Sequence, residues 1–353
     1  MYCPDDSNVK QFYTKSRVTL RDLVKTRPTL QDVAVRAGVS RTTASFVLNG
    51  RDEMRISDAA SERVRRAARE LDYRPNLAAR SLKTHLSRTV ALLSDEVATD
   101  GYAGRIIEGS LEGAVASDHM LFIGEFGGHR HLEDQLIADF LSRQVDGFVL
   151  ATTYTRLVDL PAGLSDQRLV LANCLSRGPT RAAAIPDALA AGHTAAEYLL
   201  SRGHASGIYL VGETPDDLIG ARDRRQGIED ALRLEGVELA GQIVCKWWPE
   251  SAFEAVRVFL AEGHRPQALI CLNDRVALGA YQSLAEVRLP IPEAVSVLSF
   301  DDSVLASWLR PGLTSIGIPH LEIGKRAVEL LLSSQVPAIH RLPMPLCQRG
   351  SVA

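Results

Sequence analysis

A short polar segment near residue 40 carries side chains that could recognise the edges of DNA bases. Its candidate contacts are close neighbours in the chain: Ser40, Arg41, Thr42, Thr43, Ser45 and Phe46. An arginine can donate two hydrogen bonds to O6 and N7 of guanine, and a threonine offers its hydroxyl, or a methyl group that fits thymine. Thr29 and Asn49 flank the segment and can hold phosphates in register. A small helical hairpin that only packs would also fit this spacing.

Polar residues that follow apolar runs form a second group, and their chemistry suits the binding of a small molecule. Ser94 and Asp95 end the first such run of the C-terminal part of the chain, and Asn273 and Asp274 follow a later one. Ligands of open α/β sheets bind beyond the carboxyl ends of the strands. We therefore expect these four side chains to lie near a ligand.

The remaining reactive residue types form no recognisable catalytic or metal-binding set. The five cysteines are odd in number and include no CxxC pair, which argues against a disulfide framework or a zinc site. His129 and His131 have no third ligand at motif spacing. The chain has no GxGxxG opening its first βα unit, no GxxxxGK[ST] and no GxSxG. We expect no catalytic residue, no metal and no cofactor, and therefore no enzyme.

Three short helices must position the first group. Thr29 can cap a first helix, and Gly38 supplies the permissive turn residue after it. Ser40 can cap a second helix, and Ser57 a third that runs to Leu71. Two short helices joined by a turn that contains glycine are typical of a helix-turn-helix.

From about residue 88 the pattern alternates between buried strands and amphipathic helices. The expected strands are Val90–Leu93, Leu121–Ile123, Gly147–Leu150, Leu169–Ala172, Ile208–Val211, Ala268–Leu272 and Val295–Phe300. The expected helices are Ile106–Ala116, Leu132–Ser142, Ala190–Arg202, Gly220–Glu235, Ser251–Glu262 and Val276–Val287. Such βα units build doubly wound parallel sheets. The segment is long for one sheet, so we expect two lobes.

Charge separates these two parts of the chain. The 353 residues carry a net charge of −3, but residues 1–88 hold 18 Lys and Arg against 10 Asp and Glu, whereas the rest holds 22 against 33. A basic head on an acidic body suggests that the head meets a polyanion, although a charged helical surface is often only solvated. No apolar run approaches the ~18 residues of a membrane span. The N-terminal residues include no secretory signal. These features predict a cytoplasmic, nucleoid-associated protein.

Two motifs follow one another between residues 29 and 84: TLQDVAVRAGVSRTTASFVLNG and RISDAASERVRRAARELDYRPNLAARSLKT. They resemble the DNA-binding head of LacI-type (lactose-repressor-like) bacterial transcriptional regulators. The resemblance implies that Asn76–Leu82 is a hinge helix that orders on operator DNA. Leu82 would be an apolar wedge in the minor groove, with Ala79 and Arg80 beside it, although an ordinary buried leucine is the alternative. Phe46 departs from the family, which often has a polar base-reading residue there.

The resemblance continues through the body, where it implies a periplasmic-binding-protein-like clamshell. It rests on VDGFVLA, SRGHASGIYLVGE, ARDRRQGIEDAL, ICLNDRVALGAYQSL, VSVLSFDDS and LRPGLTSI. By resemblance, Arg224 and Asp301 contact the effector, Tyr102 is an aromatic near it, and Trp247 stacks on it. Without the resemblance, Arg224 could pair with a surface acid and Asp301 could cap a helix. Trp248 could take the stacking role by a shift of one residue, and both tryptophans could be core residues.

The chemistry of these residues points to a sugar or related polyol as effector. Carboxylate, amide and guanidinium groups bind ring hydroxyls, and an indole covers an apolar sugar face. Ala103 stands where purine-responsive members of the family carry a second aromatic, which disfavours a nucleobase.

We therefore expect a homodimeric repressor that binds a near-palindromic operator under the control of a small molecule. The expected divisions are an extension at 1–28, the head at 29–74, the hinge and linker at 75–87, a first lobe at about 88–186 plus 317–336, and a second lobe at about 187–316 plus 337–353. An α/β enzyme and a solute receptor with the same clamshell are the alternatives. A regulator with a phosphorylated protein partner, or with no effector, also stays open.

Overall fold

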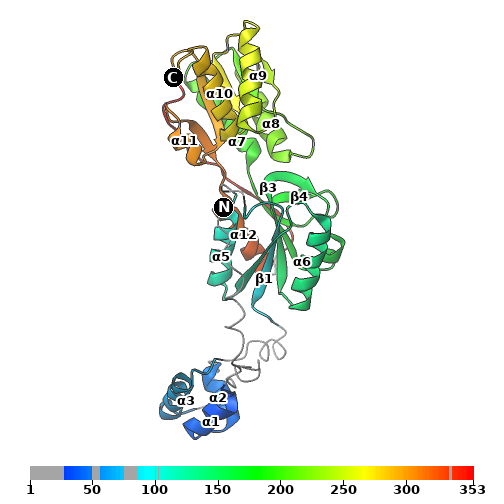
Figure 1. Ribbon diagram of the computed structural model, residues 1–353, viewed down its shortest axis with the longest axis vertical. Helices are drawn as coiled ribbons and strands as arrows, with labels where there is room; N and C mark the ends of the chain where they lie inside the picture. Colours follow the sequence, from blue (N-terminus) through cyan, green and yellow to red (C-terminus); the bar gives the residue numbers. More distant parts are fainter. Residues whose placement is uncertain (1–27, 50–55, 75–85, 100, 102, 334–335) are drawn as a thin grey trace, which may run out of the picture. The chain divides into compact units, whose positions relative to one another are not determined.

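The computed structural model describes residues 28–49, 56–74, 86–99, 101, 103–333 and 336–353. The chain divides into two compact units, residues 1–85 and 86–353, which we call the head and the body (Figure 1). The helix-turn-helix and the two-lobed α/β body predicted from the sequence are both present. Within the described residues, no helix combines the length and apolar character needed to cross a membrane.

The described part of the head consists of three helices around a small core. They are α1 (Leu30–Ala37), α2 (Arg41–Leu48) and α3 (Asp58–Glu70). Thr29, Ser40 and Ser57 cap them as expected, because each side chain accepts a hydrogen bond from a backbone N–H of the first turn. Gly38 ends α1 with φ of 64°, a conformation that favours glycine. The core side chains are Val33, Ala34, Ala37, Ala44, Val64 and Ala67.

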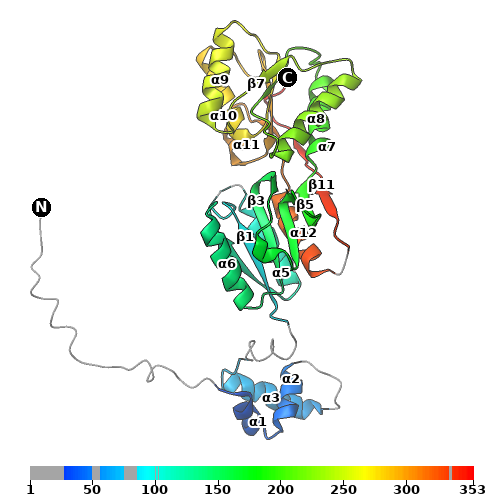
Figure 2. The same ribbon diagram turned by 90° about the vertical axis from the view of Figure 1, so that its right-hand side faces the viewer.

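The first lobe is a six-stranded parallel sheet covered on both faces by helices (Figure 2). Its strands, in spatial order, are β11 (Ile339–Leu342), β5 (Ala182–Pro186), β4 (Leu169–Ser176), β3 (Gly147–Val158), β1 (Thr89–Ser94) and β2 (Met120–Glu125). Helices α5 (Arg105–Ala116) and α12 (His320–Leu332) pack on one face. Helix α6 (Arg130–Ser142) and the 3-10 turn η1 (Ala162–Leu164) pack on the other.

The second lobe has the same architecture, except that one of its edge strands is antiparallel. Its strands are β12 (Leu346–Cys347), β10 (Thr314–Gly317), β9 (Ser296–Asp301), β8 (Ala268–Cys271), β6 (Ile208–Val211) and β7 (Gly241–Ile243). Strand β12 is antiparallel to β10, and the other pairs are parallel. The helices are α7 (Ala188–Ser201), α8 (Ile219–Leu234), α9 (Pro249–Ala261), α10 (Asp274–Glu286) and the short α11 (Val304–Trp308).

Three segments connect the lobes, and the last of them corrects the sequence-based division. The chain passes from the first lobe to the second between β5 and α7, returns between β10 and α12, and passes again between β11 and β12. The prediction assigned residues 337–353 to the second lobe, but Ile339 pairs with Ala183 in the first sheet. This part of the prediction is wrong because β11 is a short edge strand with exposed side chains, and its sequence has no buried apolar run.

Candidate functional site

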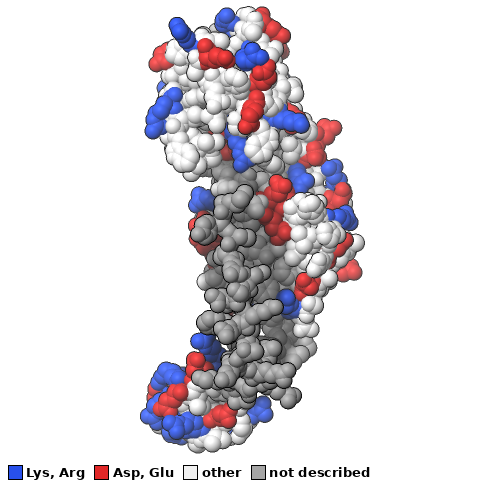
Figure 3. All heavy atoms as spheres, in the orientation of Figure 1, with Lys and Arg blue, Asp and Glu red and all other residues white. Residues whose placement is uncertain are grey.

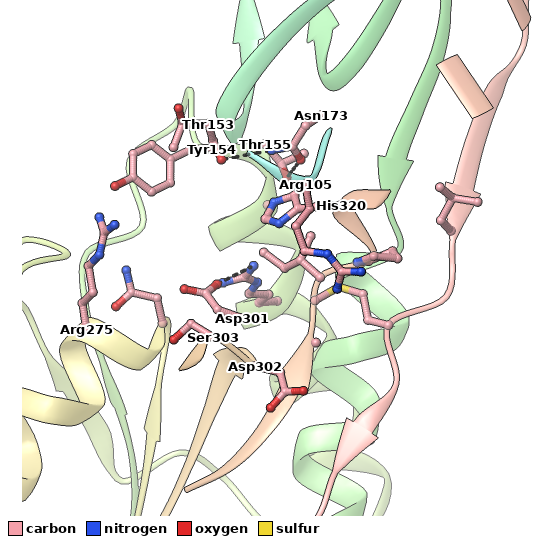
Figure 4. Close-up of a pocket in the computed structure, with 18 of the residues that line it drawn as sticks. Arg105, Thr153, Tyr154, Thr155, Asn173, Arg275, Asp301, Asp302, Ser303 and His320 are labelled. Atoms are coloured by element: carbon pink, nitrogen blue, oxygen red, sulfur yellow. Dashed lines mark hydrogen bonds and ion pairs between the residues drawn. The ribbon is translucent and has the colours of Figure 1, made fainter. Parts of the chain in front are cut away.

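A cavity of about 910 Å³ lies between the lobes of the body, within the size range of small-molecule sites (Figure 4). Both lobes contribute to its wall. The first lobe contributes Thr153, Tyr154, Thr155, Asn173 and His320, and the second contributes Arg224, Trp247, Asn273, Arg275, Asp301 and Ser303. The carboxyl ends of β3, β4, β8 and β9 all open toward this space, as expected for ligand sites of doubly wound sheets.

Arg224 and Asp301 form a buried pair of opposite charge in the wall of the cavity. The Arg224 guanidinium is 3% exposed, and its Nη2 lies 3.9 Å from Oδ1 of Asp301 (the ion pair drawn in Figure 4). Its Nη1 donates to the carbonyl of Leu272, and its centre lies 4.7 Å from that of the Phe300 ring. Burial raises the pKa of Asp301 well above its ordinary value, Arg224 opposes this rise, and the Asp274 carboxylate adds to it. The pair can both donate to and accept from a ligand.

Close packing of two helices fixes the place of Arg224. A Cβ on Gly192 in α7 would clash with the carbonyl oxygen of Arg224, and a Cβ on Gly227 in α8 would clash with that of Leu189. The two glycines therefore let the helix backbones approach closely. This approach sets the depth at which the Arg224 side chain enters the cavity wall.

Trp247, and not Trp248, lies in the cavity wall. Its indole is 9% exposed, its Nε1 donates to the carbonyl of Glu213 at 3.0 Å, and the Arg224 guanidinium lies 5.8 Å from its ring centre. Trp248 is 54% exposed and lies under Arg275 at 4.9 Å. The backbone at Trp248 is extended, so the side chains of Trp247 and Trp248 point to opposite sides.

The adjacent residues Asn273 and Asp274 have different places. Asn273 lines the cavity and caps α10, because its Oδ1 accepts from the N–H of Val276 at 2.7 Å. Asp274 is fully buried and accepts hydrogen bonds from Ser303 and Ser315 at 2.7–2.8 Å. It does not appear in the cavity wall and instead positions the loop between β9 and α11.

In the head, the polar residues near α2 divide into two sets. Ser40 accepts from the N–H of Thr43 at 3.0 Å, and Asn49 donates to the carbonyl of Ser45 at 2.7 Å, so these side chains help to hold the helix. The side chains of Arg41 and Thr42 are exposed and make no hydrogen bond to any described residue. Figure 3 shows basic side chains over much of the visible, described surface of the head, with acidic ones among them.

Comparison with known proteins identifies the family of both units. Residues 29–76 match the model of bacterial regulatory proteins of the lacI family, and residues 196–352 match that of a periplasmic binding protein-like domain. The chain is 31% identical to the HTH-type transcriptional repressor PurR of Erwinia tasmaniensis, over 86% of this chain and 91% of that protein. The chain belongs to the LacI family. The resemblance noted in the sequence is therefore confirmed.

Further relatives of this LacI-family chain agree with that assignment. It is 28% identical to the ribose operon repressor of Escherichia coli, over 91% of this chain and 95% of that protein. A crystal structure of the lac repressor dimer bound to operator and the anti-inducer ONPF matches with a TM-score of 0.76 and 25% identity, over 92% and 99% of the two chains. A CelR–cellobiose complex matches at 0.66 and 26%, over 92% and 100%. The named relatives are transcriptional regulators, and this chain is a DNA-binding regulator of the same family.

Only some of the effector-binding residues predicted for this LacI-family body lie in the cavity wall. Arg224, Trp247, Asn273 and Asp301 lie in the cavity wall together. Ser94 is buried and within 3.4 Å of Glu125, and Asp95 binds backbone and side-chain groups of β3, so neither appears in the wall. Four predicted residues lie outside the described residues: Ala79, Arg80, Leu82 and Tyr102.

Sequence reasoning missed the part of the cavity wall that the first lobe contributes. Thr153, Tyr154 and Thr155 lie in the second half of β3, and Asn173 lies opposite them in β4 with φ of 60°. The strand-end rule that selected Asn273 does not find them, because they lie within β3, which runs eight residues beyond the predicted end at Leu150. They face the cavity where the pairing of β3 with β4 changes register after Ala151.

Proposed function

We propose that this protein is a homodimeric operator-binding repressor whose DNA affinity is set by an uncharged sugar or polyol bound between the lobes. The observation that carries the proposal is the Arg224–Asp301 pair, buried beside the Trp247 indole in a cavity to which both lobes contribute. A carboxylate accepts from ligand hydroxyls, a guanidinium donates to them, and an indole covers the apolar face of a sugar ring.

Four of the charged residues that line the cavity are already held in ion pairs, which favours a ligand without net charge. Arg224 faces Asp301, the Asp302 carboxylate lies 2.7 Å from Arg349, and Arg105 lies 3.5 Å from Glu108. Because these opposite charges are already paired, an ionic ligand could form an ion pair with one of these residues only if an existing pair were broken. The names of two relatives support a sugar: a ribose operon repressor and a CelR–cellobiose complex.

In the head, α2 is the element proposed to enter the major groove. Arg41 and Thr42 would contact base edges together with Ser45 and Phe46, since the side chains of the first two are exposed and make no hydrogen bond to the described residues. Ser40, Thr43, Thr29 and Asn49 would hold the helix and the phosphates in register. By family resemblance, Leu82 would insert into the minor groove, with Ala79 and Arg80 beside it.

Dimerisation would use an apolar surface of the first lobe. Leu111 and Val115 of α5 and Met120 and Ile123 of the edge strand β2 are each about half exposed or more. We call these four residues the α5–β2 patch. Exposed apolar side chains on a helix and a neighbouring edge strand are typical of an interaction site. The lac repressor relative was crystallised as a dimer on its operator.

Effector binding would act by shifting the population of two dimer states. A ligand that contacts both lobes stabilises one angle between them, and this angle sets the separation of the two hinge segments that reach the DNA. The body would sense its ligand and not transform it, as befits relatives that are named repressors. The protein would act in the cytoplasm, where its operator is.

The test begins with a selection of genomic fragments by the purified protein, followed by footprinting of the best fragment. We expect a protected near-palindrome, and we expect Leu82→Ala to weaken operator binding strongly while the dimer persists in sedimentation. Repeating the selection with pooled sugars and pooled nucleobases identifies the class of effector. A response to nucleobases alone would overturn the sugar, and specific binding unchanged in Leu82→Ala would remove the wedge.

A further inference from the structure

The end of β3 stays paired with β4 and also contacts the second lobe. Its pairing with β4 changes register after Ala151. We call residues 152–158 the β3 arm. At its centre, the Tyr154 side chain packs against the hydrophobic core of the second lobe. Its ring lies at 87° to that of Trp247, with 5.6 Å between the ring centres. The arm is therefore a contact between the lobes that is separate from the three connecting segments.

The arm also contacts the beginning of α8 through backbone atoms. The N–H of Leu157 donates to the carbonyl of Asp217 at 2.9 Å. A Cβ on Gly220 would lie 2.9 Å from the Cβ of Thr155, so the first turn of α8 lies directly against the arm. A glycine at this position permits that approach.

Side chains of the first lobe hold the arm in its shape. The Asp95 carboxylate accepts from both the N–H and the hydroxyl of Thr153, at 3.2 and 3.3 Å, and its other oxygen lies 2.7 Å from Nη2 of Arg156. The amide of Asn173 donates to the carbonyls of Thr152 and Thr153 at 2.9 and 3.1 Å. The arm is thus fixed to the first lobe and must move with it, which explains why Asp95 does not face the cavity.

The two surfaces that receive the arm also hold the proposed effector-binding pair. Arg224 lies one helical turn after Gly220 on α8, and its guanidinium lies 5.8 Å from the centre of the Trp247 ring that Tyr154 meets. We propose that Tyr154 is a positioning residue that couples the Arg224–Asp301 pair to the first lobe through Trp247 and the first turns of α8. This inference rests on the proposed function, because the coupling matters only if a ligand bound at the pair controls operator binding.

The first test needs no ligand. Trp247 is made the sole tryptophan of the full chain by Trp248→Phe and Trp308→Phe, and both replaced residues are exposed. An aromatic pair of this geometry changes an equilibrium by about 2- to 12-fold. We therefore expect Tyr154→Ala to increase the quenching of Trp247 fluorescence by acrylamide and to speed hydrogen exchange at the Leu157 amide by about 2- to 12-fold. Tyr154→Phe keeps the ring and should change both quantities less than Tyr154→Ala does.

The matched control is Tyr209→Ala, which removes an aromatic pair that lies wholly within the second lobe. Tyr209 meets Phe259 at 4.8 Å between ring centres and 66° between ring planes. This variant should leave Trp247 quenching and Leu157 exchange unchanged even if it lowers the melting temperature. Unchanged quenching and exchange in Tyr154→Ala would overturn the contact and, with it, the coupling.

The second test measures the coupling itself on an operator fragment, with cellobiose and D-ribose as the probes. The quantity is the ratio of operator affinities with and without the sugar. We expect Tyr154→Ala to change this ratio by about 2- to 12-fold, with a smaller change in Tyr154→Phe, which keeps the ring, and with Tyr209→Ala at the parent value. If Tyr154→Ala shows the same ratio of operator affinities as the parent protein, the coupling is overturned. If neither sugar alters operator binding by the parent, the sugar proposal has failed for these probes, while the exchange experiment still decides whether Tyr154 links the arm to α8.

Discussion

The Arg224 guanidinium is buried beside Asp301, so its removal takes away a charge that solvent does not replace. We expect Arg224→Ala to lose the response of operator binding to the effector while operator binding itself is kept. A hydrogen bond that involves a charged group contributes about 1.5–3 kcal/mol, so the loss of the guanidinium should weaken effector binding by about that amount. Fluorescence anisotropy of a labelled operator, with and without the sugar, measures both quantities. Arg222→Ala, on the exposed side of the same helix, is the control, and a normal response in Arg224→Ala would remove this residue from the site.

Asp301 should make effector affinity depend on pH. Burial raises the pKa of this carboxyl well above 3.8, with Arg224 opposing and Asp274 reinforcing the rise. A ligand hydroxyl that donates to the ionised carboxylate favours the ionised form, so affinity is highest above the raised pKa and falls as the pH drops through it. Calorimetric titration of the sugar across this range measures the effect. Asp301→Asn should show weak binding with a flat profile, and a flat profile in the parent would contradict the assignment.

A site residue could be predicted where neighbouring residues determine its position, and not where residues distant in sequence do. Asn273 was predictable because it ends a strand and caps the next helix, which are both local properties. Asp274 was predicted with it, but its side chain is directed to Ser303 and Ser315, more than 25 residues away in sequence. Tyr154 was missed because its position depends on a change of pairing register between β3 and β4. Neighbouring residues do not encode such distant partners.

At the scale of elements, different side chains of α2 and its N-cap contribute to the stability of the head and to its recognition of DNA. Ser40 caps this helix by accepting from the N–H of Thr43, whereas Thr42 is exposed. Ser40→Ala should destabilise the head by about 1 kcal/mol, because a capping hydrogen bond is lost. Thr42→Ala should leave the stability within about 0.5 kcal/mol. It should lower operator affinity by about 1–3 kcal/mol if it contacts a base edge.

Thermal unfolding and operator titration of the two variants test this division. Equal stability in both variants would mean that the cap contributes nothing. Unchanged operator affinity in Thr42→Ala would remove this residue from the interface.

The elements of the body were predictable where burial leaves a continuous apolar run. All seven predicted strands and six predicted helices are present, since central strands covered on both faces are apolar along their length. Five strands were missed. Strands β7, β11 and β12 are short edge strands with partly exposed side chains. Strands β5 and β10 lie inside their sheets, but they are short and contain mainly small or polar residues, so neither gives a run of large apolar side chains. Helix α12 was missed although its apolar residues recur at helical spacing, and its burial against α5 depends on the return of the chain to the first lobe.

At the scale of the whole molecule, the α5–β2 patch determines the expected assembly. Leu111, one of the four patch residues, is half exposed. A carboxylate buried there on association would have no partner among the four patch residues, so Leu111→Asp should shift the protein toward a monomer and weaken operator binding. Sedimentation velocity at several concentrations measures this shift. Leu234→Asp, at an exposed leucine of the second lobe, should leave both assembly and operator binding unchanged. An intact dimer in Leu111→Asp would move the interface elsewhere.

The last crossing between the lobes, from β11 to β12, also affects when each lobe can complete its folding during synthesis. Strand β11 completes the first sheet and β12 the second, and Ser351 bonds to Val297 and Thr314 inside the second lobe. Domains generally fold in order as the ribosome releases them. Here each sheet lacks a strand until residues 339–347 have left the ribosome. Both lobes therefore complete their folding together, after nearly all of the body has been synthesised, whereas the head has its three helices long before.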